Sequence, residues 1–305
     1  MKVFISGLLN IETTVKIRKF PIDYYPIDYP FFGINSSVSG VAFNVAKAFS
    51  VLGDDVNLFS FVGKDDEAKL VFESLAREKI SNKNILNKIE KTPSSVVLFD
   101  EQGRRQIYCD LKNVQEQNVN YNEVKEIDKS DLFVICNTNF NRNIIKEAKS
   151  KGKLVATDVH VLNNIHDEYN TDFMKYSDIL FLSDENLPCT DVDFVKQIAN
   201  EYTNKVIVMG CGSKGAILFD RSINKTFRFD CVKCDNVSNT VGAGDALFTS
   251  FLHFYLKGFS AIDSLKRAEI FASIKIESNG ASLGFPKEST VEENVATRAP
   301  MIYEA

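Results

Sequence analysis

The most informative residues of this chain form a glycine turn, Asn-Thr-Val-Gly-Ala-Gly-Asp at 239–245, directly ahead of an apolar run over 246–256. The large apolar residues of that run recur at helical spacing, which predicts a buried helix. Gly242 and Gly244 let the backbone approach a ligand closely, and the free N–H groups at a helix N-terminus bind phosphate. Asp245 would lie beside that phosphate, where a carboxylate can accept a proton from an attacking hydroxyl. The turn therefore indicates phosphoryl transfer; the alternative is an ordinary turn whose acidic residue suits the helix dipole.

Two further groups of polar residues accompany turns in the first part of the chain. The Ser39-Gly40 pair precedes a predicted helix over 41–52, and Asn44 lies one turn inside it. A buried Asn at that place either caps the structure or holds a polar ligand by two hydrogen bonds. Asn10 and Glu12 leave the first predicted strand on the same side, from which they could bind hydroxyls. Surface polarity explains each of these two signals equally well.

A third glycine turn contains Gly210, Gly212, Ser213 and Gly215, between two strand-like segments. No helix begins there, so the turn is not a Walker A sequence, which has the spacing G-x-x-x-x-G-K-[ST] and opens a helix. Either a nucleotide lies over this turn or the turn is a plain hairpin.

The elements that must position these residues alternate between short apolar strands and amphipathic helices. Such alternation predicts a mostly parallel sheet covered on both faces, with ligands beyond the carboxyl ends of the strands. The strands are expected at 3–6, 56–62, 132–136, 154–158, 179–182, 206–209 and 216–219, and the helices at 41–52, 65–79, 141–151, 192–202, 245–257 and 261–277.

Two segments do not follow the alternation. Residues 12–36 are rich in aromatic side chains and contain three prolines, and residues 94–112 are typical of a hairpin with a polar, glycine-containing turn. They could form a small sheet that acts as a lid, an edge used for dimerisation, or a purely structural extension. Arg104 and Arg105 in the hairpin either reach toward a substrate or belong to a solvated turn. Residues 286–305 are polar and are expected to form a last turn and a tail.

Composition excludes several classes of protein. The chain has 305 residues, 44% of them hydrophobic, which suffices for one large α/β domain with an insertion or for two domains. Its net charge of −5 and its lack of a basic tract argue against a nucleic-acid partner. The apolar runs are too short for a membrane span, and no secretory leader pattern is visible, so we expect a cytoplasmic protein. Cys231 and Cys234 have neither a second cysteine pair nor a nearby histidine to complete a zinc site.

Taken in order and spacing, the four groups of motifs resemble the ribokinase-like (PfkB) carbohydrate kinase family over about residues 1–290. The motif at 239–245 is the most specific, because the family pattern is D-T-x-G-A-G-D and only Asn239 departs from it. The resemblance implies a ribokinase-like three-layer α/β/α fold with a mostly parallel central sheet and a small β lid. The core would comprise residues 1–11, 37–93 and 113–305, and the lid residues 12–36 and 94–112.

The resemblance also implies a role for each motif residue. Asp245 matches the catalytic base, and the backbone of Gly242, Ala243 and Gly244 matches an anion hole for the transferring phosphoryl group. The helix at 261–277 is expected to cover the nucleotide base. The substrate-binding positions are Asn10, Glu12, Ser39, Gly40 and Asn44, and the positions matching the nucleotide site are Gly210, Gly212, Ser213 and Gly215.

The implied cofactors are ATP and Mg²⁺, and the implied partner is a small sugar or nucleoside. The family usually has N-x-x-E where residues 183–186 of this chain are Ser-Asp-Glu-Asn, so the metal ligands stay unassigned. Asn239 replaces a residue that in some members helps to hold an activating K⁺, which leaves K⁺ activation open. Two alternatives to a sugar kinase also stay open: a nucleoside kinase that stacks a base on the aromatic residues at 20–32, and a sugar-binding relative without turnover. A homodimer through the β lid is a further expectation.

Overall fold

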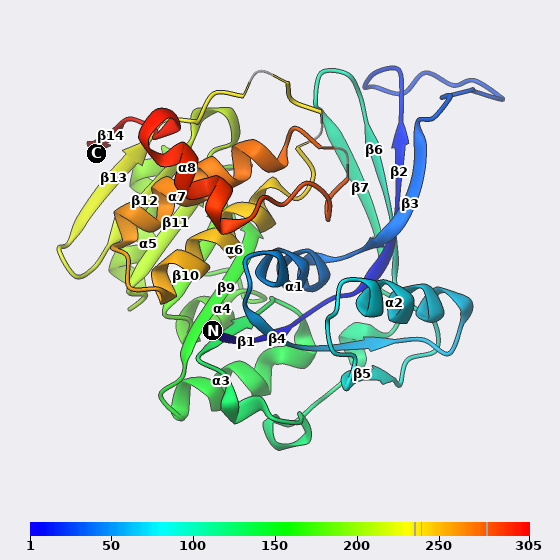
Figure 1. The fold of residues 1–305 in the computed structure, drawn as a ribbon, viewed down its shortest axis with the longest axis horizontal. Helices are drawn as coiled ribbons and strands as arrows, with labels where there is room; N and C mark the ends of the chain where they lie inside the picture. Colours follow the sequence, from blue (N-terminus) through cyan, green and yellow to red (C-terminus); the bar gives the residue numbers. More distant parts are fainter. Residues whose placement is uncertain (235, 239, 279) are drawn as a thin grey trace.

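A ten-stranded sheet forms the centre of the molecule in this computed structural model, which describes residues 1–234, 236–238, 240–278 and 280–305 (Figure 1). Across the sheet the strands are β14 (Ile302–Glu304), β13 (Lys225–Phe229), β12 (Ala216–Asp220), β11 (Val206–Gly210), β10 (Ile179–Ser183), β9 (Leu154–Val161), β8 (Leu132–Ile135), β1 (Lys2–Ser6), β4 (Asp55–Val62) and β5 (Asn84–Asn87). From β11 to β5 all neighbours are parallel, whereas β12, β13 and β14 form an antiparallel edge.

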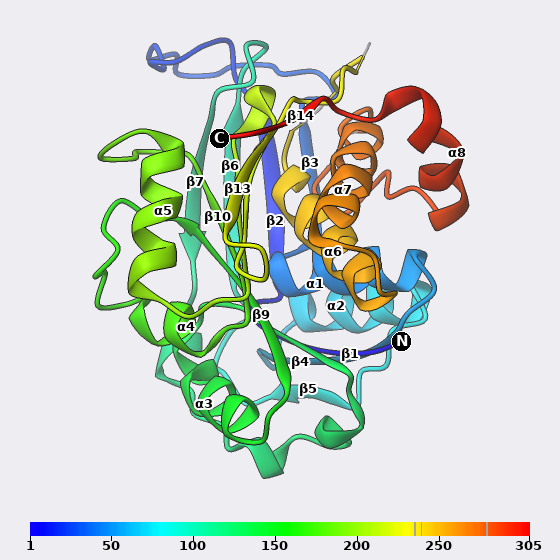
Figure 2. The same ribbon diagram turned by 90° about the vertical axis from the view of Figure 1, so that its left-hand side faces the viewer.

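Helices cover both faces of this sheet, as Figure 2 shows. One face carries α1 (Val41–Val51), α2 (Asp66–Arg77), α6 (Ala243–Leu256) and α7 (Ala261–Lys275); the other carries α3 (Arg142–Ser150), α4 (Thr171–Tyr176) and α5 (Asp191–Glu201); and α8 (Glu288–Arg298) packs on α7. Short 3₁₀ segments lie at Val114–Glu116, Tyr121–Glu123, Ile127–Lys129, Asn139–Asn141 and Gly212–Lys214. The result is a three-layer α/β/α arrangement with a mostly parallel sheet, as expected from the alternation.

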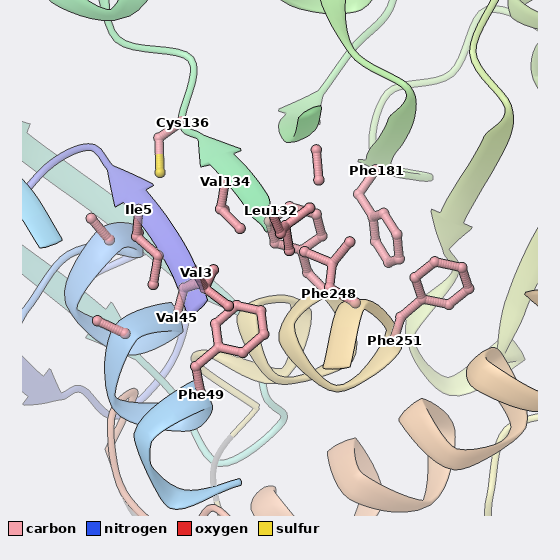
Figure 3. Close-up of a cluster of buried hydrophobic side chains, with 14 of the residues drawn as sticks. Val3, Ile5, Val45, Phe49, Leu132, Val134, Cys136, Phe181, Phe248 and Phe251 are labelled. Atoms are coloured by element: carbon pink, nitrogen blue, oxygen red, sulfur yellow. The ribbon is translucent and has the colours of Figure 1, made fainter. Parts of the chain in front are cut away.

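The core sits on both sides of the sheet because its strands are apolar on both faces. In β1, Val3 and Ile5 pack into one cluster and Phe4 packs into the other. This pattern is typical of parallel strands that are covered by helices on both faces. Figure 3 shows the first cluster, where Phe248 and Phe251 of α6 meet the central strands.

A second, four-stranded sheet stands beside the larger one and has the order β3-β2-β6-β7. Its strands are β2 (Asn10–Lys16), β3 (Ile34–Ser39), β6 (Ser94–Phe99) and β7 (Arg105–Asp110). The hairpin of β6 and β7 is confirmed, and Asp100 accepts hydrogen bonds of 3.0 Å from the backbone N–H groups of Gln102 and Arg104 in its turn. Between β2 and β3 the chain carries the exposed side chains of Tyr24, Phe31 and Phe32.

All the strands and helices expected from the alternation occur within three residues of their expected ends. The elements β5, β13 and α4 are not among those predicted from the sequence. The expectation for residues 286–305 is wrong, because they form α8 and β14 instead of a tail. Val291 is the one fully buried residue of α8, so the helix has no apolar stripe to reveal it.

All six cysteines are free, and Cys136 and Cys211 are buried as small apolar side chains. Within the described residues, no helix combines the length and the apolar character needed to cross a bilayer.

Truncating Phe251 to alanine tests how much the α6 face contributes to stability. Its ring is fully buried and lies 5.3 Å from that of Phe181, centroid to centroid. We expect Phe251→Ala to lower the free energy of unfolding in urea by about 3–5 kcal/mol, because it leaves a cavity in a close-packed core. Leu70→Ala on α2, where the side chain is 50% exposed, is the control and should change stability by less than about 0.5 kcal/mol. Equal effects of the two changes would contradict this view of the core.

Candidate active site

The glycine turn ahead of α6 has the conformation that an anion site requires. Gly242 is the N-cap residue of α6 with φ 79°, and a Cβ at that position would lie 2.4 Å from the carbonyl oxygen of Ala281. Gly244 is exposed, and a Cβ built on it meets nothing within 4 Å. Among the described residues no side chain caps this helix. The Ala243 N–H donates to the carbonyl oxygen of Thr240 at 3.1 Å, whereas the N–H groups of Gly244 and Asp245 lie in the first turn, at an end that no described side chain covers.

Asp245 lies in the first turn of α6 and is held by a side chain from another helix. The Asn44 Nδ2 atom donates a 2.7 Å hydrogen bond to Asp245 Oδ2. Asn44 Oδ1 in turn accepts a hydrogen bond of 3.4 Å from the Ser39 hydroxyl. Because a carboxylate has two oxygens, this contact leaves Asp245 Oδ1 available for another hydrogen bond. The structure thus joins three of the expected site residues in one chain of contacts.

Burial raises the pKa of the Asp245 carboxyl from its ordinary value to about 6. The hydrogen bond from Asn44 and the positive charges of His160 and Lys275 act in the opposite direction, whereas the charge of Asp158 adds to the increase. A carboxyl with a pKa near 6 is mostly ionised at neutral pH, yet it is a stronger base than an exposed aspartate. The environment therefore tunes this group toward proton transfer.

Asn10 and Glu12 bring two unpaired oxygens to the same region. Asn10 is almost fully buried and donates a 2.8 Å hydrogen bond to the Ser95 hydroxyl, but its Oδ1 atom has no partner among the described residues, and neither has the buried Oε1 atom of Glu12. Burial, followed by the nearby charge of Asp245, raises the pKa of Glu12. Buried acceptors without a donor are costly, which makes them candidates for hydrogen bonds from a bound hydroxyl.

Position 40 lies between Asn10 and the start of α1, and the backbone there leaves no room for a side chain. The φ of Gly40 is 99°, and a Cβ there would lie 2.4 Å from the carbonyl oxygen of Leu8 and 3.2 Å from Asn10 Oδ1. A larger residue would push the β1–β2 connection away from the N-terminus of α1. Gly40 thereby keeps Asn10 close to the start of the helix that carries Asn44.

Asp158 and His160, at the end of β9, are site residues that the sequence motifs do not predict. Asp158 is 9% exposed, and its Oδ1 atom accepts a 2.8 Å hydrogen bond from the backbone N–H of His160. His160 Nδ1 lies 3.5 Å from Asp158 Oδ2. Both charges act on Asp245, so the pair belongs to its electrostatic environment. The available signal was their position directly after an apolar strand, where α/β sheets bind ligands.

Lys275, the last residue of α7, was also missed because it looks like an ordinary basic residue at a helix C-terminus. Its side chain is fully buried, and its Nζ atom donates hydrogen bonds to the carbonyl oxygens of Val241 and Gly280, the latter at 3.0 Å. Burial lowers the pKa of this ammonium to about 8, while the charges of Asp245 and Glu12 favour its charged form. No sequence pattern distinguishes such a lysine from one in solvent.

The turn at 211–215 joins β11 to β12, which run antiparallel. Gly212 and Ser213 are exposed, whereas Gly215 is buried with φ 89°, and a Cβ on it would lie 2.0 Å from the carbonyl oxygen of Phe229. Gly210 ends β11, and a Cβ there would be 3.7 Å from the Leu247 side chain of α6. The end of β11 is thus close to the second turn of α6, but in the described part of the chain no hydrogen bond or ion pair joins Gly212 or Ser213 to Asp245.

The residues at 183–186 carry two carboxylates that are both engaged in ion pairs. Asp184 Oδ2 accepts a 2.7 Å contact from Lys214 Nζ, and Glu185 Oε1 lies 3.3 Å from Arg105 of β7. Within the described part of the chain, no group of three or more His, Cys, Asp or Glu side chains could enclose a metal ion. A Mg²⁺ ion that arrives with nucleotide phosphates needs only one or two carboxylates, and Asp184 and Glu185 have suitable oxygen donors.

The two arginines of the hairpin have different roles. Arg104 binds Asp100 within its own turn, with Nη2 2.7 Å from Oδ2, as expected for a solvated turn. Arg105 instead connects the second sheet to the residues that follow β10 through Glu185. Asn239, the one departure from the D-T-x-G-A-G-D pattern, lies outside the described residues.

Comparisons with known proteins agree on one family. The model of the pfkB family carbohydrate kinases matches residues 20–288. A ribokinase of Dictyostelium discoideum is 24% identical over 95% of this chain and 98% of its own length, and a nucleoside kinase of Methanocaldococcus jannaschii is 22% identical over 96% of each. The solved structure of a microbiome-derived acarbose kinase, Mak1, superposes with a TM-score of 0.85 at 22% identity over 97% of this chain and 98% of that one.

The raised pKa of Asp245 predicts a pH-dependent stability effect. Because the folded-state pKa is about 6, above the ordinary value of 3.8, ionisation of this group opposes folding above pH 6 and has no effect below pH 4. We therefore expect Asp245→Asn to raise the free energy of unfolding by about 1–3 kcal/mol at pH 8, with a difference that shrinks toward pH 4.5. Denaturant unfolding at several pH values measures this.

The matched control is Asp66→Asn in the first turn of α2, where the side chain is 89% exposed. Its effect on stability should not grow between pH 4.5 and pH 8 in the way expected at Asp245. A destabilised Asp245→Asn protein at pH 8 would show that the charged form is favoured by the fold, contrary to this account.

Proposed function

The chain belongs to the pfkB family of carbohydrate kinases, enzymes that transfer a phosphoryl group to an alcohol hydroxyl, and on that premise we propose that it transfers the γ-phosphoryl group of ATP to a hydroxyl of a sugar or sugar-like substrate. One observation carries the proposal: Asp245 occupies the first turn of α6, beside a helix N-terminus that no side chain of the described residues caps, with its carboxylate held by Asn44. This is the arrangement needed by a base that works next to a bound anion.

In this proposal Asp245 orients the acceptor hydroxyl and takes its proton as the oxygen attacks phosphorus. The hydrogen bond from Asn44 fixes one carboxylate oxygen, so that the other can face the hydroxyl. General-base catalysis of this kind contributes on the order of 10²–10⁴-fold. In phosphoryl transfer, positioning of the reactants and electrostatic stabilisation of the transition state supply the larger part of the rate enhancement.

The anion hole is proposed at the backbone of Gly242, Ala243 and Gly244. N–H groups at a helix start are fixed dipoles, which stabilise developing negative charge without reorganisation. The open space at Gly244 supports this assignment, since a side chain there would stand between the helix and the phosphoryl group.

The acceptor substrate is proposed to bind between the N-terminus of α1 and β2. Asn10 Oδ1 and Glu12 Oε1 are buried acceptors that receive no hydrogen bond from the described residues, and substrate hydroxyls would supply one. Ser39, which pairs with Asn10 across β2 and β3, and Asn44 of α1 supply further polar groups, and Gly40 keeps α1 close to β2. A substrate with several hydroxyls fits this set of acceptors better than a hydrophobic alcohol does.

The nucleotide is proposed to lie over the turn with Gly210, Gly212, Ser213 and Gly215, with α7 covering its base. Exposed backbone at Gly212 and Ser213 and the adjacent Lys214 suit contact with a nucleotide. Mg²⁺ would be held by the phosphates with oxygen donors from residues 184 and 185, and it would neutralise charge on the transferring group.

The second sheet is proposed to act as a lid over the substrate. Its strand β2 carries Asn10 and Glu12, and Arg105 of β7 reaches Glu185 across the site. Closure of such a sheet would exclude water and suppress hydrolysis of ATP.

A nucleoside kinase is the second candidate, since the exposed rings of Tyr29 and Phe31 stack at 6.2 Å between centroids and could receive a nucleobase. One of the relatives is a nucleoside kinase. A sugar-binding protein without turnover is the candidate from another class, although a pure binder has no need of the Asp245 carboxylate.

A panel of sugars and nucleosides with ATP and Mg²⁺, read by ADP release, tests the proposal. We expect turnover with at least one sugar, and we expect Asp245→Asn to reduce kcat on it by about 10²–10⁴-fold with a smaller change in KM. The control Asp66→Asn should leave kcat unchanged. Full activity of Asp245→Asn would refute the role of the base, turnover of nucleosides alone would favour the second candidate, and calorimetric sugar binding without ATP consumption would favour the binder.

The exposed aromatic segment between β2 and β3 predicts a homodimer through the second sheet. Tyr24, Phe31 and Phe32 are 88%, 85% and 101% exposed, and such a group of apolar side chains usually marks an interface. We expect light scattering to give about twice the chain mass of 34.3 kDa at micromolar concentration. Phe31→Ser combined with Phe32→Ser should yield a folded monomer. A monomeric unmodified protein under these conditions would contradict the prediction.

A further inference from the structure

Lys275 is a buried cation whose hydrogen-bond partners are main-chain carbonyls. Its Nζ atom donates to the carbonyl oxygens of Val241 and Gly280, and no described carboxylate pairs with it directly. A fully buried lysine is rare unless its charge is satisfied. Here the partial charges of two carbonyls and the more distant carboxylates of Asp245 and Glu12 supply that compensation.

The two carbonyls belong to loops that meet behind the proposed anion hole. Val241 immediately precedes the N-cap residue Gly242, whereas Gly280 belongs to the loop that follows α7. The loops are packed closely, since a Cβ on Gly242 would lie 2.4 Å from the Ala281 carbonyl oxygen. Val241 and Ala281 also form a small apolar cluster with Val97 of β6. The ammonium therefore joins both loops at the point where α6 begins.

Carbonyl oxygens contributed by two loops are also the ligands that K⁺ takes in proteins. An ammonium group carries the same charge, and at neutral pH the Lys275 group is mostly protonated even though burial lowers its pKa to about 8. Lys275 Nζ thus already occupies the carbonyls of Val241 and Gly280, the same ligands that a K⁺ ion at this place would use.

We propose that the tethered ammonium of Lys275 takes the place of an activating monovalent cation, so that this chain needs no added K⁺. The ammonium holds the Val241 carbonyl and thereby the backbone that enters the turn at 242–244. It also provides a positive charge that favours the ionised form of Asp245. Lys275 is a positioning residue, since it contacts the loops and not the reacting atoms. The activity readout of this inference rests on the proposed function.

The test measures how added cations affect the unmodified protein and a variant in which removal of the Lys275 ammonium leaves room for a cation. Unmodified protein should have the same kcat, within about twofold, in KCl and in N-methylglucamine chloride. Lys275→Ala should lose roughly tenfold or more in kcat, because the donor that fixes the turn is gone. KCl, NH₄Cl or methylammonium chloride should restore part of this loss, and N-methylglucamine should not. Lys266→Met on the same helix, whose Nζ pairs with Asp263 at 3.0 Å, is the control and should behave like the unmodified protein.

The melting temperature gives a second readout that does not depend on turnover. Small cations should raise the melting temperature of Lys275→Ala, relative to N-methylglucamine at equal ionic strength, and should not raise that of the unmodified protein. If Lys275→Ala does not fold, Lys275→Gln, which keeps a donor but not the charge, replaces it. A strong requirement of the unmodified protein for K⁺, or a Lys275→Ala protein with full activity and no cation response, would overturn the proposal. Absence of turnover with every compound would instead count against the proposed function, while the melting readout would still decide this inference.

Discussion

The proposed site depends on one electrostatic constraint, which is that Asp245 has to be ionised to act as a base although burial opposes its charge. Burial raises the pKa of this carboxyl to about 6, and the hydrogen bond from Asn44 together with the charges of His160 and Lys275 keeps it from rising further. These groups come from α1, from the end of β9 and from the end of α7. Three separate parts of the chain thus limit the increase in the pKa of the same carboxyl group. The balance places its pKa close to neutral pH, where a general base is most effective.

Two close backbone contacts bring the residues around Asp245 together. Gly40 and Gly242 both have positive φ and both approach a carbonyl oxygen too closely for any Cβ. These two close contacts bring the start of α1 next to the β1–β2 connection and the start of α6 next to the loop after α7. Asn44 and Asp245 consequently meet across the two helix starts at 2.7 Å, although they are far apart in the sequence. The second sheet contributes the oxygens of Asn10 and Glu12, which have no hydrogen-bond partner among the described residues.

Whether a feature of the fold or the site could be predicted from the sequence depends on how far apart in the chain its interacting residues lie. The strands and helices of the larger layers could be predicted because apolar periodicity is local, and the turn at 239–245 could be recognised because its glycines and Asp245 are neighbours in the chain. The helix α8 was missed because Val291 alone is fully buried in it. Lys275 and His160 were missed because their importance comes from partners that only the fold brings close. Lys275 is an ordinary helix-terminal lysine in the sequence, and it is buried only because the loops that contain Val241 and Gly280 cover it in the fold.

A crystal structure with Mg²⁺, a non-hydrolysable ATP analogue and the substrate found by the panel tests the central claim most directly. The account predicts an acceptor oxygen within about 2.6–3.2 Å of an Asp245 carboxylate oxygen. It also predicts terminal phosphate oxygens at the backbone N–H groups of residues 242–244. Phosphates bound away from the start of α6, or an acceptor hydroxyl that faces away from Asp245, would contradict it.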